Sequence, residues 1–250
     1  RRRVCVMKSK DLRHFTPPRI IYRAPENYAC TEADNINFFT VGDYPMAFIH
    51  MFRADNVDDC RHQRMLPNIA MGRDVFSLKT NILEKPIIEM GKNLSYDDNR
   101  VCIDSPPFDL FGDDRSYFYG RGMDARKGEI NIALFSFEKD RYIAATADIY
   151  GGWLLTREFY FRGSHIEIDA DVPENGEVMA EILEGDHGQV RGGRALVGYT
   201  LSDCDVVRGD SHKHRLTFGG SDDLSSLVGR AVYLRFHIVN AKLYSFKVLD

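Results

Sequence analysis

Short apolar runs that alternate with polar residues, or that gather β-branched and aromatic residues, occur along the whole chain of 250 residues. Few windows keep apolar residues at the spacing of a helix, so the pattern predicts strands. The clearest runs are "RVCVM", "INFFTV", "MAFIHMF", "INIALFSF", "HIEIDAD", "VYLRFHIV" and "KLYSFKV", with "KPIIEM" and "ALVGYT" as weaker examples. We therefore expect an all-β protein. One or two helical turns are expected at "SDDLSSLVG", with Ser221 or Asp222 capping the start and Gly229 closing the end.

The spacing of the strands changes along the chain. Up to about residue 150, irregular acidic loops separate the apolar runs, whereas from Gly151 onward the runs are evenly spaced with short turns. The last hundred residues are about the size of one β-sandwich. We therefore expect two domains, residues 1–150 and residues 151–250, the second an antiparallel β-sandwich.

Two stretches of the first domain repeat one pattern, "VMKSKDLRHF" at residues 6–15 and "IAMGRDVFSL" at residues 69–78. A repeat of roughly sixty residues that contains several strands is typical of a β-propeller, whose blades are small antiparallel sheets. Asp11 and Asp74 would then accept backbone N–H groups within equivalent tight turns. Phe15 and Phe76 would pack between neighbouring sheets. Residues 1–150 are long enough for about two and a half blades.

Charge and cysteine content narrow the classes of partner. The 33 basic and 37 acidic residues give a formal net charge of −4, so no broad cationic surface is available and nucleic acid is not expected as a partner. No apolar run is long enough to span a membrane, so no membrane partner is expected either. The five cysteines are widely spaced and odd in number, and we expect them to be mostly free and buried: Cys5, Cys30, Cys60, Cys102 and Cys204.

The repeated motifs also resemble a known family. "SKDLRHF" followed by "PPRIIY", and "GRDVFSL" followed by "EKPIIEMG", are similar to the S-K/R-D-x-x-x-W blade signature of the five-bladed propeller glycoside hydrolases, the group of invertases, levansucrases and arabinanases. The stretch from "GGWLLTREFYF" to "KLYSFKV" resembles the sandwich appended to a bacterial branch of these proteins. The resemblance implies a carbohydrate-active protein with a partial five-bladed propeller. The first blades, where the family carries its nucleophile or base aspartate, would be missing.

Glycoside hydrolysis needs two carboxyl groups on either side of the scissile bond. In a propeller they lie at the axial ends of innermost strands, here expected at "INFFTV" and "VCIDSPPFDL". The catalytic candidates are Glu32, Asp34, Asp97 and Asp104. By the resemblance, Glu32 would be the general acid, and Asp97 or Asp104 a positioning group. The same acids could instead cap turns or lie in solvated loops.

Aromatic and basic residues near these acids could hold a sugar. The candidates for substrate binding are Tyr28, Tyr96 and Arg100, because aromatic faces stack on sugars and charged groups bind hydroxyls. Aromatic residues beside strands are more often part of a core.

Other constellations are weaker. His212 and His214 could share a strand face for zinc, but no further ligand is evident in the sequence. "GRGMDA" matches a loose G-x-G-x-x-A pattern but precedes a strand, so no dinucleotide site is expected. Calcium is a further alternative to an ordinary solvated surface for five acids of the second domain, Asp169, Asp171, Asp186, Asp203 and Asp205. We expect no metal and no cofactor.

Two functions therefore stay open. The first is a glycoside hydrolase-like protein, with two carboxyl groups about 5–9.5 Å apart in an open cleft. The second is a carbohydrate-binding or scaffold module without catalysis, which needs only an aromatic platform, or an inactive fragment of a longer glycosidase. An unclosed propeller would leave apolar strands exposed, so we expect pairing with another copy or with a missing N-terminal segment.

Overall fold

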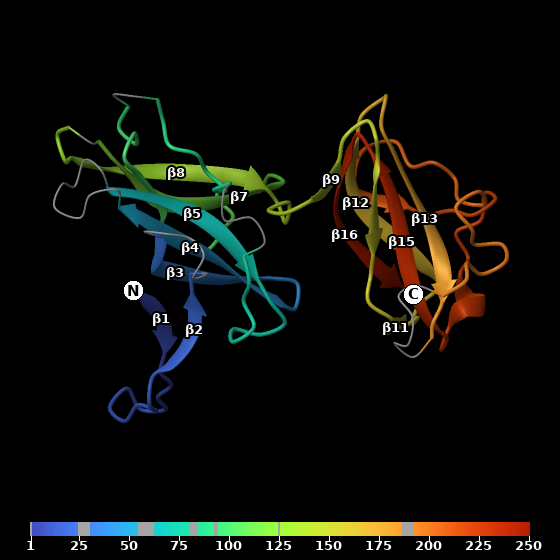
Figure 1. The fold of residues 1–250 in the computed structure, drawn as a ribbon, viewed down its shortest axis with the longest axis horizontal. Helices are drawn as coiled ribbons and strands as arrows, with labels where there is room; N and C mark the ends of the chain where they lie inside the picture. The colour runs from blue at the N-terminus through green and yellow to red at the C-terminus, as the bar shows by residue number, and fades with distance from the viewer. Residues whose placement is uncertain are drawn as a thin grey trace. The chain divides into compact units, whose positions relative to one another are not determined.

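The structure is a computed structural model that describes residues 2–24, 31–54, 63–80, 85–92, 95–124, 126–186 and 193–250. It confirms the all-β prediction, because the described residues contain strands and a single-turn 3-10 helix. The chain divides into two compact units, which we call unit 1 (Arg1–Tyr142) and unit 2 (Ile143–Asp250). Figure 1 shows the strands of each unit in chain order from blue to red.

Unit 1 contains a hairpin and a curled six-stranded sheet. The hairpin is formed by β1 (Arg3–Val6) and β2 (Arg19–Arg23), and the loop between them extends away from the sheet in Figure 1. The sheet has the order β3-β4-β5-β6-β7-β8. Its strands are β3 (Thr31–Val41), β4 (Tyr44–Ala54), β5 (Gln63–Met71), β6 (Arg100–Ile103), β7 (Arg115–Met123) and β8 (Ile130–Glu138).

The six strands form two antiparallel meanders, β3-β4-β5 and β6-β7-β8. One parallel backbone bridge, between Met65 and Arg100, joins the meanders into a continuous sheet. A propeller would hold them as separate blades around an axis. No propeller is detected in the described residues, and the expectation of separate blades was not met because the sheet continues through this bridge.

Two side chains of the first meander bond the backbone of β6. The amide of Ile103 donates a hydrogen bond of 2.9 Å to Nε2 of His50, and its carbonyl accepts one from Nδ2 of Asn37. His50 is fully buried. Burial, with the charge of Arg121 as a second cause, lowers the pKa of His50 to about 4. Nε2 can accept from an amide only while it is unprotonated, so neutral His50 holds the two meanders together.

The two faces of the first meander have different cores. On one face an aromatic cluster connects the meanders, with Phe48 and Phe118 rings 5.0 Å apart in edge contact. Phe39, Phe137 and Tyr142 complete this cluster. On the other face Ile49 and Met51 pack against Tyr22 of the β1–β2 hairpin. The hairpin therefore covers the face that the second meander leaves open.

The repeated aspartate turns have the predicted local structure. Asp11 accepts hydrogen bonds from the amides of Arg13 and His14, and Asp74 accepts one from the amide of Phe76. These bonds, led by those from His14, lower the pKa of Asp11. The prediction for the aromatic residues was wrong at Phe15, which is 52% exposed. Phe76 instead packs under Arg19, whose guanidinium lies 3.9 Å from the ring centre.

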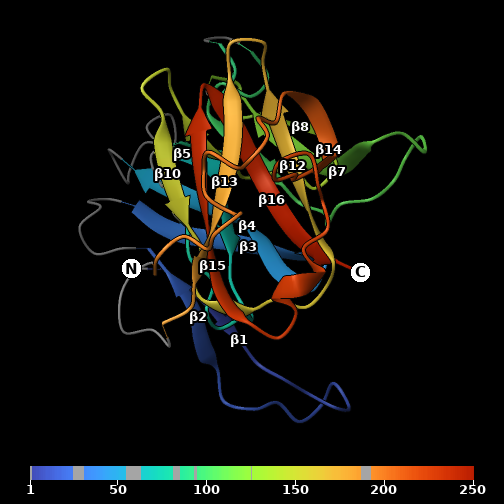
Figure 2. The ribbon, with the colours of Figure 1, turned by 90° about the vertical axis from the view of Figure 1, so that its right-hand side faces the viewer.

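Unit 2 is built from two four-stranded sheets that enclose one core, the arrangement of a β-sandwich. One sheet has the order β14-β12-β16-β9, and in the other β15 pairs with β10, β11 and β13. Figure 2 shows β13 and β15 running side by side. The strands are β9 (Ala145–Ala147), β10 (Gly152–Leu155), β11 (Phe159–Tyr160), β12 (His165–Val172), β13 (Glu177–Glu184), β14 (Gly209–Arg215), β15 (Ala231–Val239) and β16 (Ala241–Leu249).

Some local predictions needed correction. "KPIIEM" and "ALVGYT" are not strands; each makes isolated backbone contacts, such as the bond from Ile87 to the carbonyl of Pro67. The short helix is a single 3-10 turn, Ser225–Leu227, and the amide of Ser225 bonds Asp223 rather than either predicted cap. Cys102 and Cys204 are free and buried as predicted, whereas Cys5 is free but exposed. Cys30 and Cys60 lie outside the described residues.

Candidate functional site

Glu32 and Asp34 lie near the start of β3 and share one cation. Nε of Arg2 lies 3.7 Å from Oε2 of Glu32, and Nη1 of Arg2 bonds Oδ1 of Asp34. The register of β3 against β4 shifts between Ala33 and Asn35, so Asp34 is the extra residue of a bulge. The space between these carboxylates is therefore filled by Arg2 and not open to a sugar.

Tyr96 and Asp97 lie against β7 at Gly122. A Cβ atom at Gly122 would come within 2.7 Å of Cβ of Asp97 and 2.8 Å of the Tyr96 ring, so only glycine leaves room for them. Oδ1 of Asp97 accepts a hydrogen bond of 2.7 Å from the hydroxyl of Ser95. Burial, with the charge of Asp97 as a second cause, raises the pKa of Tyr96. Asp97 thus helps to shape a loop, and Tyr96 is 47% exposed beside it.

Asp104 directly follows β6, and its carboxylate forms an ion pair with Arg121 of β7. Oδ2 of Asp104 lies 3.5 Å from Nε of Arg121. Burial raises the pKa of Asp104, and the charge of Arg121 acts in the opposite direction. Arg121 and Gly122 are consecutive residues of a strand and project to opposite faces. Asp104 and Asp97 therefore contact opposite faces of β7 and do not converge as a catalytic pair.

The remaining predicted binding residues do not complete a sugar site. Nη2 of Arg100 donates a hydrogen bond of 2.9 Å to Oε1 of Gln63, within the sheet. Tyr28 lies outside the described residues. Among the described carboxylates that the sequence predicted as catalytic, only Glu32 and Asp34 are brought together, and they are brought together around Arg2.

The residues considered for metal binding are bonded to other groups. Nδ1 of His212 lies 2.8 Å from Oδ2 of Asp169, whereas Nε2 of His214 lies 3.1 Å from the carbonyl of Gly209. The two histidines thus serve different partners. Within the part of the chain that the structure describes, no group of three or more His, Cys, Asp or Glu side chains could hold a metal ion.

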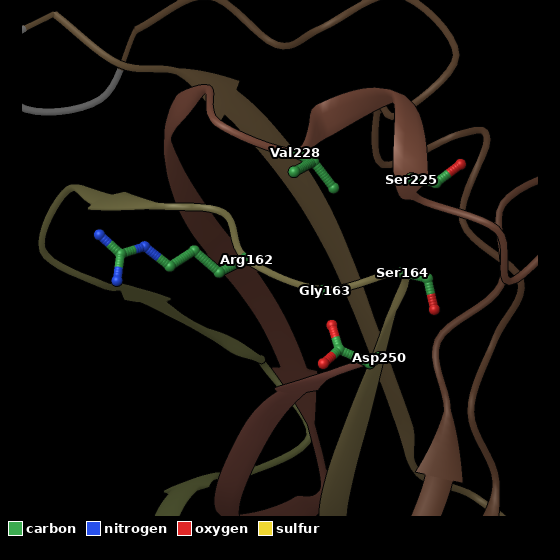
Figure 3. A pocket seen from close by; sticks show the side chains of 6 residues that line it. All are labelled: Arg162, Gly163, Ser164, Ser225, Val228 and Asp250. Atoms are coloured by element: carbon green, nitrogen blue, oxygen red, sulfur yellow. The ribbon is translucent and has the colours of Figure 1, made fainter.

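A shallow depression lies in unit 2, next to the end of β16. Its volume is about 330 Å³, and it is lined by Arg162, Gly163, Ser164, Ser225, Val228 and Asp250. Figure 3 shows the Arg162 side chain directed away from Ser164 and Ser225. The depression therefore presents few groups that converge on one point, and it offers no evident chemistry.

A surface that the sequence reasoning missed lies on the outer face of the β10-β15-β13 sheet. Along β13 and β15, alternate residues such as Ala180 and Phe236 belong to the core, so their neighbours face outward. The outward residues include Trp153 of β10, Arg235 and His237 of β15, and Glu177 and Glu181 of β13. We call these five residues the Trp153 surface.

The Trp153 surface combines an exposed ring with fixed charged groups. Trp153 is 56% exposed, its ring centre lies 4.6 Å from that of His237, and the Arg235 guanidinium lies 5.1 Å from the Trp153 ring centre. Arg235 is held by Glu181, which is buried, and Nδ1 of His237 lies 3.9 Å from Oε1 of Glu177. The sequence carried one signal for this surface, since Trp153 is the single tryptophan of the chain.

Comparisons with known proteins give a distant likeness. No family model matches the chain, and no curated protein matches it. Among solved structures the chain is similar to the Bombyx mori GH32 beta-fructofuranosidase BmSUC1, with a TM-score of 0.27 and 12% sequence identity. The match covers 98% of this chain and 61% of that chain, so this chain spans less than two thirds of the length of the enzyme. A likeness this distant does not indicate a function.

No helix within the described ranges is long and apolar enough to cross a membrane.

Proposed function

We propose that this chain recognises carbohydrate and that the Trp153 surface is its binding site. The observation that carries the proposal is the exposed indole of Trp153 beside a guanidinium that is itself fixed by a buried carboxylate. Aromatic rings stack on the apolar C–H side of a sugar, and charged groups beside the ring bind hydroxyls and fix its orientation. Arg235 and Glu177 supply such groups around the ring.

The arrangement favours binding over cleavage. Arg235 is held in place by Glu181 before any ligand arrives, so little side-chain freedom is lost on binding. Of the two carboxylates in the Trp153 surface, Glu181 is buried and bonded to Arg235. The surface therefore does not offer a pair of carboxylates that could act on a sugar. The sequence resemblance to propeller glycosidases and their appended sandwich adds independent support for carbohydrate as the ligand class.

The test uses the single tryptophan as its own reporter. Titration of the chain with a panel of mono- and oligosaccharides should change the fluorescence of Trp153, and calorimetry of the same mixtures should give an affinity. Trp153→Ala should weaken binding at least tenfold, which corresponds to about 1.4 kcal/mol. The matched control is Tyr44→Ala, which removes an aromatic ring that is 60% exposed in unit 1. Equal binding by both variants, or no binding across the panel, would refute the proposal.

Cleavage of a glycosidic bond is the second candidate, and Asp104 is the observation in its favour. Burial raises the pKa of Asp104, the direction that a general acid requires. We would measure hydrolysis of the same saccharide panel by the unaltered chain and by Asp104→Asn and Glu32→Gln. Loss of turnover in either variant, with the fold retained, would support catalysis. Turnover that survives both substitutions would remove these residues from a mechanism.

In this proposal the two meanders of unit 1 would correspond to two blades of a five-bladed propeller.

A further inference from the structure

The positive charge of the chain is unevenly distributed. The net charge is −4, yet residues 1–23 contain one acidic residue, Asp11, and eight basic residues: Arg1, Arg2, Arg3, Lys8, Lys10, Arg13, Arg19 and Arg23. Residues 2–23 form the β1–β2 hairpin and its loop, which we call the basic hairpin. A cluster of one sign attracts the opposite sign over about 10 Å in about 0.1 M salt. The basic hairpin is therefore a cationic surface on an anionic chain.

The cations beside the tip of the loop are not neutralised by the acid between them. Asp11 is used within its own turn, where it accepts hydrogen bonds from the amides of Arg13 and His14, and its Oδ2 lies 2.6 Å from Nδ1 of His14. At the base of the hairpin, Arg2 is paired with two acids of β3. Lys10 and Arg13 are exposed, and neither side chain forms an ion pair with another residue that the structure describes. Both charges are thus available to an anionic partner.

Leu12 lies at the tip between these cations. Its side chain is 84% exposed, and its φ of +59° lies in the left-handed region that leucine rarely adopts. Such strained residues cost free energy and cluster at functional sites. Phe15, which closes the loop by a backbone bridge to Ser9, is 52% exposed. The loop extends away from the six-stranded sheet (Figure 1), so it presents apolar side chains and cations together.

We propose that the basic hairpin binds the surface of a membrane that contains anionic lipids. Leu12 enters the boundary between headgroups and acyl chains, while Lys10 and Arg13 contact lipid phosphates on either side of it. Insertion of one apolar side chain is weak by itself, and electrostatic attraction adds the second contribution that attachment requires. A contact of this kind needs no spanning segment, so the absence of a spanning run in the sequence does not bear on it.

The apolar tip favours a membrane over other anionic partners. A nucleic acid or an anionic polysaccharide would neutralise Lys10 and Arg13 but leave Leu12 in water. A lipid surface offers phosphates for the cations and an apolar layer for the leucine. Residues 24–250 contain more acidic than basic residues, so an anionic surface repels the rest of the chain and attracts the hairpin. The charge distribution therefore orients the loop toward the lipid.

The first test is cosedimentation of the unaltered chain with lipid vesicles. Vesicles of phosphatidylcholine alone are compared with vesicles of phosphatidylcholine mixed with phosphatidylglycerol. Binding should be at least about tenfold stronger to the anionic vesicles. It should be lost in about 1 M salt, where the screening length falls to about 3 Å. Equal binding to both kinds of vesicle, or binding to neither, would overturn the proposal.

Leu12→Gly separates insertion from folding. Glycine adopts a φ of +59° without strain, so this variant should unfold at the same or a higher temperature, yet its affinity for anionic vesicles should fall at least about fivefold. Val197→Gly is the matched control, since it removes a side chain that is 97% exposed in unit 2. Replacing Lys10 and Arg13 together by glutamine should lower the affinity more than about tenfold. Lys213→Gln, at an exposed position of β14, should leave it unchanged.

Two soluble polyanions represent the other occupants. Short duplex DNA and heparin are titrated into the unaltered chain and into Leu12→Gly. Tighter binding of either polyanion than of anionic vesicles, unaffected by Leu12→Gly, would overturn the membrane proposal and assign the cations to that polyanion. Vesicle binding that Leu12→Gly leaves unchanged would overturn it as well, because the leucine would then not be inserted.

Discussion

Strand β16 of unit 2 and strand β8 of unit 1 are each nine residues long, yet they present opposite surfaces to solvent. The exposed residues of β16 are Lys242, Ser245 and Lys247, whereas three of the four on β8 are Ile130, Ile132 and Leu134. Alternation of buried and exposed positions is therefore common to both strands, but of the two only β16 carries polar residues at its exposed positions. The difference shows that unit 1 exposes an apolar strand face, that of β8.

The cores of the two units also differ in how completely they are covered. In unit 2 the two sheets enclose one cluster of apolar residues that includes Phe161, Leu216 and Phe236, all fully buried. In unit 1 the first meander is covered on both faces, by the aromatic cluster and by the hairpin, while β8 keeps its apolar face open. The predictions below test whether the two units behave as this comparison indicates.

The largest expected effect comes from removing one buried ring in each unit. Phe236→Ala in unit 2 and Phe118→Ala in unit 1 each delete a fully buried side chain, and each should cost about 3–5 kcal/mol of unfolding free energy. Differential scanning calorimetry should show that each substitution lowers the transition of its own unit and leaves the other near its original temperature. A single transition that both variants lower equally would contradict the division into two units.

Acid should destabilise unit 1 through His50. The pKa of His50 is near 6.5 in an unfolded chain and is lowered to about 4 in the folded one. A histidine with a lowered pKa contributes its full stability above the unfolded value, and this is lost as the pH falls from about 6.5 toward 4. The loss approaches about 1.4 kcal/mol for each pH unit within that window.

Urea unfolding at several pH values, with the signal of each unit followed by hydrogen exchange, measures this loss. His50→Gln keeps a side-chain acceptor without the titrating ring, so unit 1 of this variant should lose the pH step between about 6.5 and 4. If the step were unchanged in His50→Gln, another group would be responsible for it.

A smaller effect is expected where the Tyr96 loop meets β7. Gly122→Ala places a methyl group 2.7 Å from Cβ of Asp97 and 2.8 Å from the Tyr96 ring, and part of the strain can relax through movement of Tyr96, which is 47% exposed. The cost should be about 1 kcal/mol in the transition of unit 1. The control in unit 2 is Gly152→Ala, whose new atom would lie 3.3 Å from Cβ of Ala147. A larger loss of unfolding free energy in Gly152→Ala than in Gly122→Ala would show that the close contacts at Gly122 are not what makes a substitution costly.

The sequence predicted much of the local structure and little of the site. Period-2 alternation identified strands such as "HIEIDAD" and "VYLRFHIV", because their core-facing residues are apolar and few turn residues interrupt them. The aspartate turns were predictable since a carboxylate accepts amides two or three residues ahead of it. Both kinds of inference use contacts between residues close in the chain.

The site could not be predicted in the same way because it depends on distant pairs. The sequence placed Glu32 and Asp34 as free catalytic acids, and nothing near them in the chain indicates that Arg2 lies between them. The opposite placement of Asp97 and Asp104 follows from the alternation along β7. Trp153 gains its significance from Arg235, which comes from another strand and is held there by Glu181.

The seam between β5 and β6 has a consequence for how unit 1 responds to force. The meanders are joined by one backbone bridge, the two side-chain bonds at Ile103, the Arg100–Gln63 bond and the aromatic cluster, whereas β3 and β4 are joined along ten paired residues. Hydrogen bonds between two strands resist a pulling force together, so a pair of strands with few such bonds separates at a lower force. When a chain is pulled from its two ends in an optical trap, we therefore expect the six-stranded sheet to part first at this seam, releasing two intact three-stranded pieces. If β3 separated from β4 before the meanders did, this expectation would fail.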